Sequence, residues 1–206
     1  MFFEFLYWTV GRLIKWIFRL QPEGLENLPR HGVLLCPNHA SNWDPVLIGV
    51  CLPHNYHLRI MAKEALFHNK ALAWLIRKLG AFPVTRGTAD IQSVKTAMQV
   101  IKDGQNLLIF PEGTTIRNGL GYVDGLPPHA HSGIAVIGVR SGATLVPVFA
   151  DGPKKPFHKH RIIFGKPYTP VYTGRRGTSE EMQKIADDIL GEAYALGGQK
   201  VGGEPL

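Results

Sequence analysis

Two patterns of hydrophobic and polar residues recur along this chain. Short apolar runs are typical of buried strands, and stretches with apolar residues three or four apart are typical of helices that cover a core. The runs predict strands at 33–36, 59–62, 82–84, 106–110, 144–149 and 162–164, and the helical spacing predicts helices at 44–50, 70–79, 91–102, 134–140 and 179–196. Short strands separated by helices predict an α/β fold, a mixed, mainly parallel sheet flanked by helices.

Three residues mark the expected ends of these elements. Asp44, followed by Pro45, is typical of a helix N-cap and first helical position, and Ser179 is expected to cap the last helix. Pro147 interrupts an apolar run. Because proline has no backbone N–H, it favours the edge of the sheet or a strand end beside a site, and a plain core strand is the alternative.

The first 22 residues are the most hydrophobic part of the chain. Cations fall inside the apolar run, and small residues for a cleavage site are missing, so the order is wrong for a secretory signal. On a helix, the charges share one narrow arc: Glu4, Arg12, Lys15 and Arg19. The pattern predicts an amphipathic helix lying in the membrane interface over 1–22, followed by one domain over 23–206. A core helix and a tilted membrane span are the alternatives.

Composition adds a charge preference. The chain has 206 residues, a formal net charge of +7 and 45% hydrophobic residues. Such an excess of cations favours polyanionic partners, which are nucleic acid, anionic lipid, or an acidic protein or cofactor. Cys36 and Cys51 show no spacing typical of a zinc site or a disulfide framework.

His39 is the first candidate for chemistry. It follows a predicted buried strand, and α/β folds bind ligands beyond the carboxyl ends of strands. Asp44 lies five residues on, after a turn that can return its carboxylate to one ring nitrogen. Such a carboxylate fixes the tautomer and favours the imidazolium that forms when the other nitrogen takes a proton. Taken alone, this spacing also fits a structural His–Asp hydrogen bond.

Two further segments carry polar candidates. Glu112 also follows a strand, where its carboxylate can bind substrate hydroxyls, and Gly113 allows a ligand close to the backbone. Arg86 follows an extended segment and can grip a phosphate with two hydrogen bonds, and Lys63 is a similar cation. The alternatives are an exposed turn for Glu112 and solvated cations for Arg86 and Lys63.

Together these segments resemble the glycerophospholipid acyltransferase family, particularly its 1-acylglycerol-3-phosphate acyltransferase branch. Four segments that correspond to family motifs occur in order between about residues 24 and 172: NHxSxxD at 38–44, Gly80–Arg86 for GxxFxxR, FPEGT at 110–114, and a VPV segment at 146–148. In the second, Gly80 and Arg86 have the spacing of the motif, and the phenylalanine stands one position early, at Phe82. The resemblance implies His39 as base, Asp44 as its partner, Arg86 as a phosphate ligand, and an acceptor site at Glu112, Gly113 and Thr114.

The sequence departs from the family pattern near the acceptor site. Thr115 stands where the family usually has arginine directly after FPEGT, and Arg117 matches another frequent basic position. Ala130 and His131 stand where the family often has a Phe-Lys pair. These changes bear on the acceptor headgroup, which can be lysophosphatidic acid, another lysophospholipid or an ornithine-type lipid.

The resemblance implies acyl transfer without a metal or other cofactor. His39 would take the proton of a lysophospholipid hydroxyl, whose oxygen attacks the thioester of acyl-CoA or acyl-carrier protein. The sn-2 hydroxyl of 1-acylglycerol-3-phosphate is the expected acceptor, and phosphatidic acid the product. The expected partners are membrane lipids, not nucleic acid, and the expected location is the cytoplasmic face of the cell membrane.

Other classes of function stay open at this point. A hydrolase would use Ser41 as nucleophile beside His39 and Asp44, although Ser41 lacks a GxSxG context. A non-catalytic module would bind lipid or nucleic acid. The basic cluster at 154–161 is either a solvated loop or a patch that binds the headgroup or the donor. Pairs of histidines are candidates for a metal site, but no cysteine or carboxylate cluster completes them: His54 with His57, His129 with His131, and His158 with His160.

Overall fold

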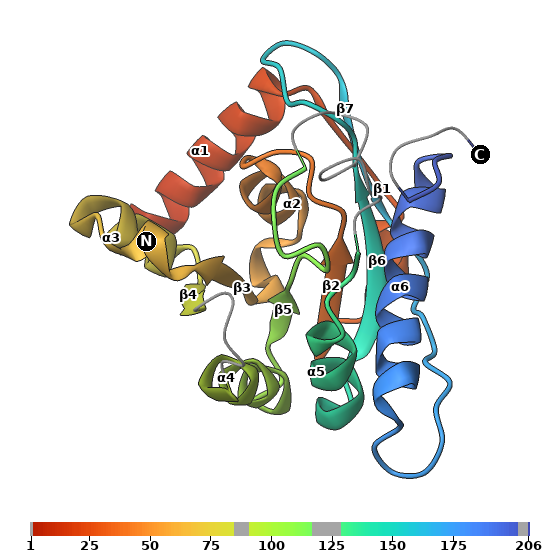
Figure 1. The fold of residues 1–206 in the computed structure, drawn as a ribbon. Helices are drawn as coiled ribbons and strands as arrows, with labels where there is room; N and C mark the ends of the chain where they lie inside the picture. Colours follow the sequence, from red (N-terminus) through yellow and green to blue (C-terminus); the bar gives the residue numbers. More distant parts are fainter. Residues whose placement is uncertain (1, 85–90, 117–128, 202–205) are drawn as a thin grey trace.

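One sheet runs through the part of the chain that the computed structural model describes, which is residues 2–84, 91–116, 129–201 and 206. Its strand order is β1-β7-β6-β2-β5-β3-β4 (Figure 1). Neighbouring strands are parallel except β6 and β7. The strands are β1 (Leu20–Glu23), β2 (Val33–Pro37), β3 (Leu58–Lys63), β4 (Ala81–Val84), β5 (Asn106–Leu108), β6 (Thr144–Ala150) and β7 (His160–Phe164).

Helices cover both faces of this sheet, as the hydrophobic pattern predicts. They are α1 (Phe2–Ile17), α2 (Asp44–Cys51), α3 (Lys70–Lys78), α4 (Ile91–Lys102), α5 (Gly133–Ser141) and α6 (Ser179–Leu196), with short 3-10 turns at Leu25–Asn27, His54–Tyr56 and Glu64–Phe67. On one face, alternate residues of β2, β5 and β6 pack on α4, α5 and α6. On the other face, the intervening residues pack on α2 (Figure 1). The predicted mixed, mainly parallel α/β sheet is confirmed.

Helix ends differ from the predictions by one residue. Trp43, not Asp44, occupies the N-cap position of α2, because the helix already begins at Asp44. No side chain caps this helix, and the Asp44 carboxylate accepts from the Ser41 N–H of the preceding loop. Thr178, not Ser179, caps α6. Its hydroxyl accepts from the Glu181 N–H while the Glu181 carboxylate accepts from the Thr178 N–H, a capping box.

Pro147 lies on an inner strand, so the expectation of a sheet edge is wrong. It pairs with Cys36 of β2 on one side. On the other side its carbonyl accepts from the Gly165 N–H, directly after the last residue of β7. The missing N–H of Pro147 faces that same side, where the ladder with β7 ends, so the proline can remove only the last hydrogen bond of that ladder.

The sequence pattern did not predict β1. Its residues Leu-Gln-Pro-Glu lack an apolar run, and the strand forms by pairing with β7 at the edge of the sheet. The predicted division after residue 22 falls inside this strand.

α1 packs on α2 and leaves its outer side open. Val10, Leu13 and Trp16 recur on that side, and the Trp16 side chain is 66% exposed. The Trp16 ring meets the edge of Phe157, another exposed aromatic residue. Within the described ranges, no helix is long and apolar enough to cross a bilayer.

Candidate active site

The predicted site residues follow the carboxyl ends of adjacent parallel strands. His39 comes two residues after β2, and Glu112 comes four residues after β5, its neighbour in the sheet. Lys63 is the last residue of β3, the next strand along, and is exposed there. Arg86 and Arg117 lie outside the described residues. The topology therefore brings Glu112 next to His39 and leaves Lys63 two strands away from His39.

Asn38 fixes the start of the loop that carries His39. Its side-chain amide donates to the Ala150 carbonyl at 3.0 Å and its oxygen accepts from the Ala150 N–H at 2.7 Å. This pair continues the ladder between β2 and β6 with side-chain atoms in place of backbone atoms. A buried amide with both groups satisfied holds the next residue firmly.

His39 and Asp44 form a buried pair. Nδ1 of His39 lies 3.1 Å from Oδ2 of Asp44, and the same oxygen accepts from the Ser41 N–H at 2.7 Å. The His39 ring stacks on Phe110 with 3.8 Å between ring centroids. His39 is 7% exposed and Asp44 is fully buried. The carboxylate thus keeps the proton of a neutral ring on Nδ1 and leaves a lone pair on Nε2.

A hydroxyl group lies at the free nitrogen of His39. Oγ1 of Thr115 is 2.9 Å from Nε2 and 3.1 Å from Oδ1 of Asn42. When His39 is neutral, Thr115 donates its proton to Nε2. When His39 carries a second proton, the hydroxyl accepts from Nε2 and can donate to Asn42 instead. The geometry at Nε2 therefore suits an alcohol in both protonation states of the ring.

Glu112 lies next to the loop that carries His39, and both of its carboxylate oxygens accept hydrogen bonds. Oε2 accepts from the His39 N–H at 2.7 Å, and Oε1 accepts from the Tyr194 hydroxyl at 2.6 Å. Burial raises the pKa of Glu112 to about 7, against the two hydrogen bonds, which lower it. Its binding of a substrate hydroxyl stays a prediction, and its contacts favour a role in positioning His39.

The residues after Glu112 differ in exposure. Gly113 has φ +65°, a backbone conformation that favours glycine, and a side-chain carbon there would meet the His131 ring at 2.6 Å. Thr114 is exposed at the surface of the same turn. The structure adds Phe110, Tyr194 and Thr115 to the site. Phe110 and Thr115 lie in and directly after the FPEGT segment, and only their contacts with His39 were not predicted, whereas nothing in the sequence pointed to the contact of Tyr194 with Glu112.

Comparisons with known proteins identify the family. A family model described as Acyltransferase matches residues 19–151, well over half of the chain. This chain belongs to the acyltransferase family. Similar curated proteins include 1-acyl-sn-glycerol-3-phosphate acyltransferases of Bacillus subtilis, 34% identical over 69% of this chain and 70% of that protein, and of Streptococcus pneumoniae, 28% identical over 84% of this chain and 62% of that protein.

Two other relatives of this acyltransferase bear on acceptor and fold. The lyso-ornithine lipid O-acyltransferase of Pseudomonas aeruginosa is 32% identical over 52% of this chain and 40% of that protein. The crystal structure of the 1-acyl-sn-glycerophosphate acyltransferase PlsC of Thermotoga maritima has the same fold. It superposes with a TM-score of 0.64 at 22% identity, covering 94% of this chain and 81% of that one.

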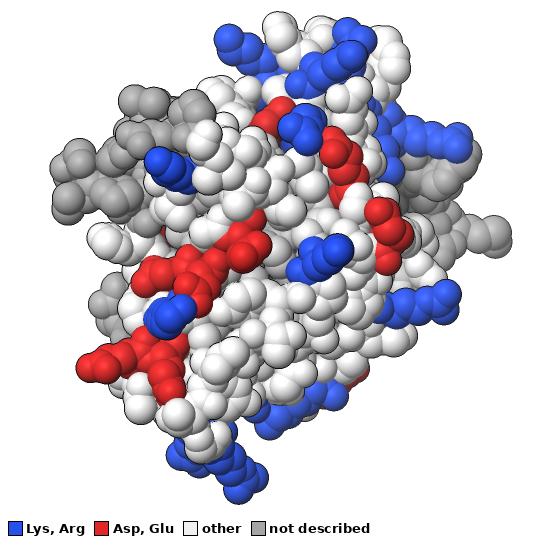
Figure 2. Space-filling view, turned by 90° about the vertical axis from the view of Figure 1, so that its right-hand side faces the viewer, with Lys and Arg blue, Asp and Glu red and all other residues white. Residues whose placement is uncertain are grey.

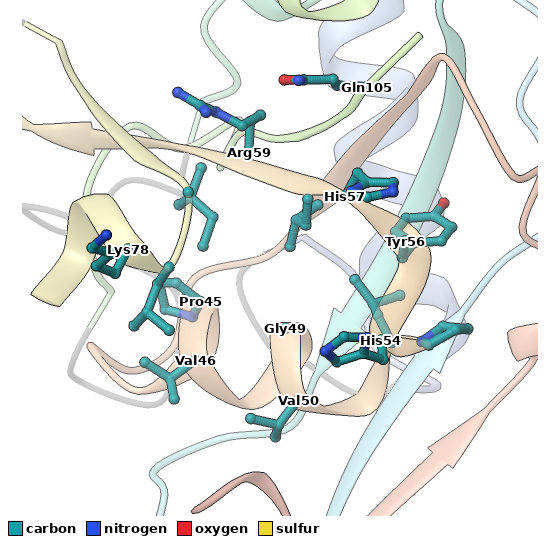
Figure 3. A pocket seen from close by; sticks show the side chains of 16 residues that line it. Pro45, Val46, Gly49, Val50, His54, Tyr56, His57, Arg59, Lys78 and Gln105 are labelled. Atoms are coloured by element: carbon teal, nitrogen blue, oxygen red, sulfur yellow. The ribbon is translucent and has the colours of Figure 1, made fainter. Parts of the chain in front are cut away.

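The enzyme has a cavity of about 340 Å³ behind α2. Val46 and Val50 of α2 line one wall, and β3 with the end of α3 forms the other (Figure 3). The lining is mainly apolar and includes Pro45, the residue after Asp44, but neither His39 nor Asp44 lines the cavity.

The acyltransferase does not place Ser41 as a nucleophile. The Ser41 hydroxyl accepts from the Trp43 N–H at 3.2 Å, and its backbone N–H serves Asp44. Nε2 of His39 instead meets Thr115, so the hydrolase alternative with Ser41 lacks its key contact.

Proposed function

We propose that this enzyme moves a fatty acyl group from acyl-CoA or acyl-carrier protein to the sn-2 hydroxyl of 1-acylglycerol-3-phosphate. His39 takes the proton of the acceptor hydroxyl on Nε2, and the acceptor oxygen attacks the thioester carbonyl. The C–S bond then breaks, and the proton passes from Nε2 to the departing thiolate. The products are phosphatidic acid and the free thiol of the donor.

The geometry of His39 carries this proposal. Asp44 holds the proton of the neutral ring on Nδ1, so Nε2 can act as a base. The Thr115 hydroxyl at 2.9 Å shows that an alcohol oxygen fits at Nε2, and the acceptor hydroxyl would take that place. Asp44 also stabilises the imidazolium that forms during the attack.

The relatives support the choice of acceptor. Three of the similar proteins, from Bacillus subtilis, Streptococcus pneumoniae and Arabidopsis thaliana, are named 1-acyl-sn-glycerol-3-phosphate acyltransferases. A lyso-ornithine lipid is the second candidate. The Pseudomonas aeruginosa relative carries that name, and Thr115 in place of the family's arginine removes a cation next to the base. A zwitterionic acceptor needs fewer cations than a phosphate monoester does.

We infer that α1 docks the enzyme on a membrane. Its exposed residues Val10, Leu13 and Trp16, with Phe157 beside Trp16, suit the apolar side of a bilayer interface. Figure 2 shows acidic side chains gathered in a band on the opposite side of the molecule, where α6 lies. An anionic bilayer repels that side and favours contact through α1.

An acceptor panel with purified enzyme tests the activity. Wild type is expected to convert 1-acylglycerol-3-phosphate in anionic vesicles with acyl-CoA or acyl-carrier protein, read by lipid mass spectrometry. His39→Ala is expected to lower the rate by about 10²–10⁴-fold, the usual contribution of a general base. His31→Ala, at an exposed histidine before β2, serves as the matched control and should keep the wild-type rate.

Each arm of the panel can contradict the proposal. Transfer to lyso-ornithine lipid but not to 1-acylglycerol-3-phosphate would make lyso-ornithine lipid the acceptor. Wild-type turnover by His39→Ala would remove His39 as the base. Vesicle sedimentation of a Leu13→Glu, Trp16→Glu double variant tests docking separately, and unchanged binding by this variant would contradict the role of α1.

A further inference from the structure

Lys154 is a buried cation in the loop between β6 and β7. Its side chain is fully buried, whereas Lys155 and Lys159 of the same loop are exposed. An ammonium group loses much hydration when it is buried, and it is tolerated only where charges or carbonyls replace the lost water. The surroundings of Lys154 must therefore supply negative charge.

Two carboxylates supply that charge, and one belongs to the catalytic pair. Nζ of Lys154 lies 2.8 Å from Oδ1 of Asp151 and 3.5 Å from Oδ1 of Asp44. The ammonium also donates to the carbonyls of Asp151 and Gly152. Within the described part of the chain, Oδ1 of Asp44 accepts no hydrogen bond, so Lys154 is the group that offsets its charge.

We propose that Lys154 is a positioning residue for acyl transfer, which holds Asp44 with Oδ2 toward His39 and offsets part of the negative charge on that carboxylate. This inference rests on the proposed role of His39 as the base. The two oxygens of Asp44 have different partners: Oδ2 faces the His39 ring, and Oδ1 faces the Lys154 ammonium. The cation at Oδ1 opposes rotation of the carboxylate and so keeps Oδ2 at Nδ1 of His39.

The sign of the electrostatic effect follows from the charges around the pair. A fully uncompensated Asp44 would stabilise the imidazolium of His39 and delay its loss of a proton as the pH rises. The positive charge of Lys154 weakens that stabilisation, and the negative charge of Asp151 in turn reduces the effect of Lys154 on Asp44. The titratable groups packed around this chain of charges are Glu112 beneath His39, His160 on Oδ1 of Asp151 at 3.1 Å, and Arg161, whose N–H binds Oδ2 of Asp151.

Two substitutions should move the pH profile in opposite directions. In Lys154→Met, the acidic limb of the kcat profile is expected to move to higher pH by about one pH unit, because the variant loses a buried unit charge 3.5 Å from the Asp44 carboxylate that holds the ring. Lys154→Arg keeps the positive charge and should leave the acidic limb at its wild-type pH. Asp151→Asn should move the limb to lower pH, because Lys154 then acts on Asp44 alone. The matched control, Lys159→Met, should leave it in place.

The outcomes separate a positioning role from a structural one. A structural role would lower the plateau of kcat at every pH without moving the limb, and this result would overturn the proposal. The KM for the acceptor should stay unchanged, because Lys154 lies on the Asp44 side of the ring, away from Nε2. If Lys154→Met does not fold, Asp151→Asn still decides, since an unmoved limb there contradicts the coupling.

A readout without turnover keeps this test apart from the proposed function. The ring protons of His39 can be followed by NMR as the pH changes in wild type, Lys154→Met and Asp151→Asn. Opposite movements of the His39 midpoint in the two variants support the charge chain even if no acyl transfer is found with any acceptor. A wild type without transfer would overturn the proposed function, and matching midpoints in all three proteins would overturn the role of Lys154.

Discussion

Replacing Glu112 with glutamine changes one charge beneath the catalytic loop and little else. The carboxyl group is 4% exposed and accepts from the His39 N–H and the Tyr194 hydroxyl. Glutamine has the shape of the protonated acid. Its oxygen can still accept from His39, and the Tyr194 hydroxyl can turn to accept from the new amide.

The expected effect is a change in the pH dependence of stability. Burial raises the pKa of Glu112 from 4.5 to about 7 in the folded protein. Folding therefore favours the protonated form, and the stability that Glu112 provides is fully present below pH 4.5 and is lost as the pH rises through 7. The loss amounts to about 3 kcal/mol of unfolding free energy in wild type, at about 1.4 kcal/mol per unit of pKa. Glu112→Gln has no such loss.

Urea unfolding at several pH values between 4.5 and 8 measures this quantity. The difference in unfolding free energy between wild type and Glu112→Gln cancels the contributions of other titrating groups. This difference should shift by about 3 kcal/mol in favour of the variant over that range. If this difference stays constant with pH, burial does not raise the pKa of Glu112, and the account of Glu112 as a buried positioning group is wrong.

Three other substitutions test neighbouring contacts. Tyr194→Phe leaves an oxygen of Glu112 unpaired, and urea unfolding at pH 8 should show a loss of about 1–3 kcal/mol. Thr115→Val removes the hydroxyl at Nε2 of His39 but should change the acyl-transfer rate by less than about tenfold, because the acceptor supplies its own hydroxyl. A loss as large as that of His39→Ala would instead give the Thr115 hydroxyl a direct part in acyl transfer, and a trapped acyl-enzyme would be needed to make it a nucleophile. Asn106→Ala removes a fully buried amide with three backbone partners, and the unfolding free energy should fall by more than about 2 kcal/mol.

Sequence periodicity predicted the buried strands and long helices because their patterns are local. The helix over Ile91–Lys102 has the predicted bounds, since its apolar spacing and the following Asp-Gly both mark its end. β1 was missed because its partner, β7, lies far along the chain and its own residues carry no pattern. Pro147 was placed at an edge because the missing N–H was visible in the sequence, whereas the end of the β6–β7 ladder was not.

The candidate site divides in the same way. His39 and Asp44 are five residues apart, so their spacing and the resemblance to a family together predicted their pairing. Tyr194 reaches Glu112 from the last helix, and Lys154 reaches Asp44 from a loop that looked like a solvated basic cluster. Such contacts depend on how helices and loops pack on the sheet, and neither residue type nor spacing encodes them.

The two nitrogens of His39 lie in different electrostatic surroundings, and in the proposed mechanism this difference gives the proton its direction. Fixed charges gather on the Nδ1 side, where Asp44 and Lys154 follow one another. A neutral hydroxyl, that of Thr115, lies on the Nε2 side, at the position where the family usually has arginine. When Nε2 takes a proton from the acceptor, the negative charge of Asp44 stabilises the imidazolium, and the positive charge of Lys154 limits that stabilisation. If the proposal holds, that proton can then pass to the thiolate, and Lys154, by limiting the basicity of His39, would also assist this second half of the reaction.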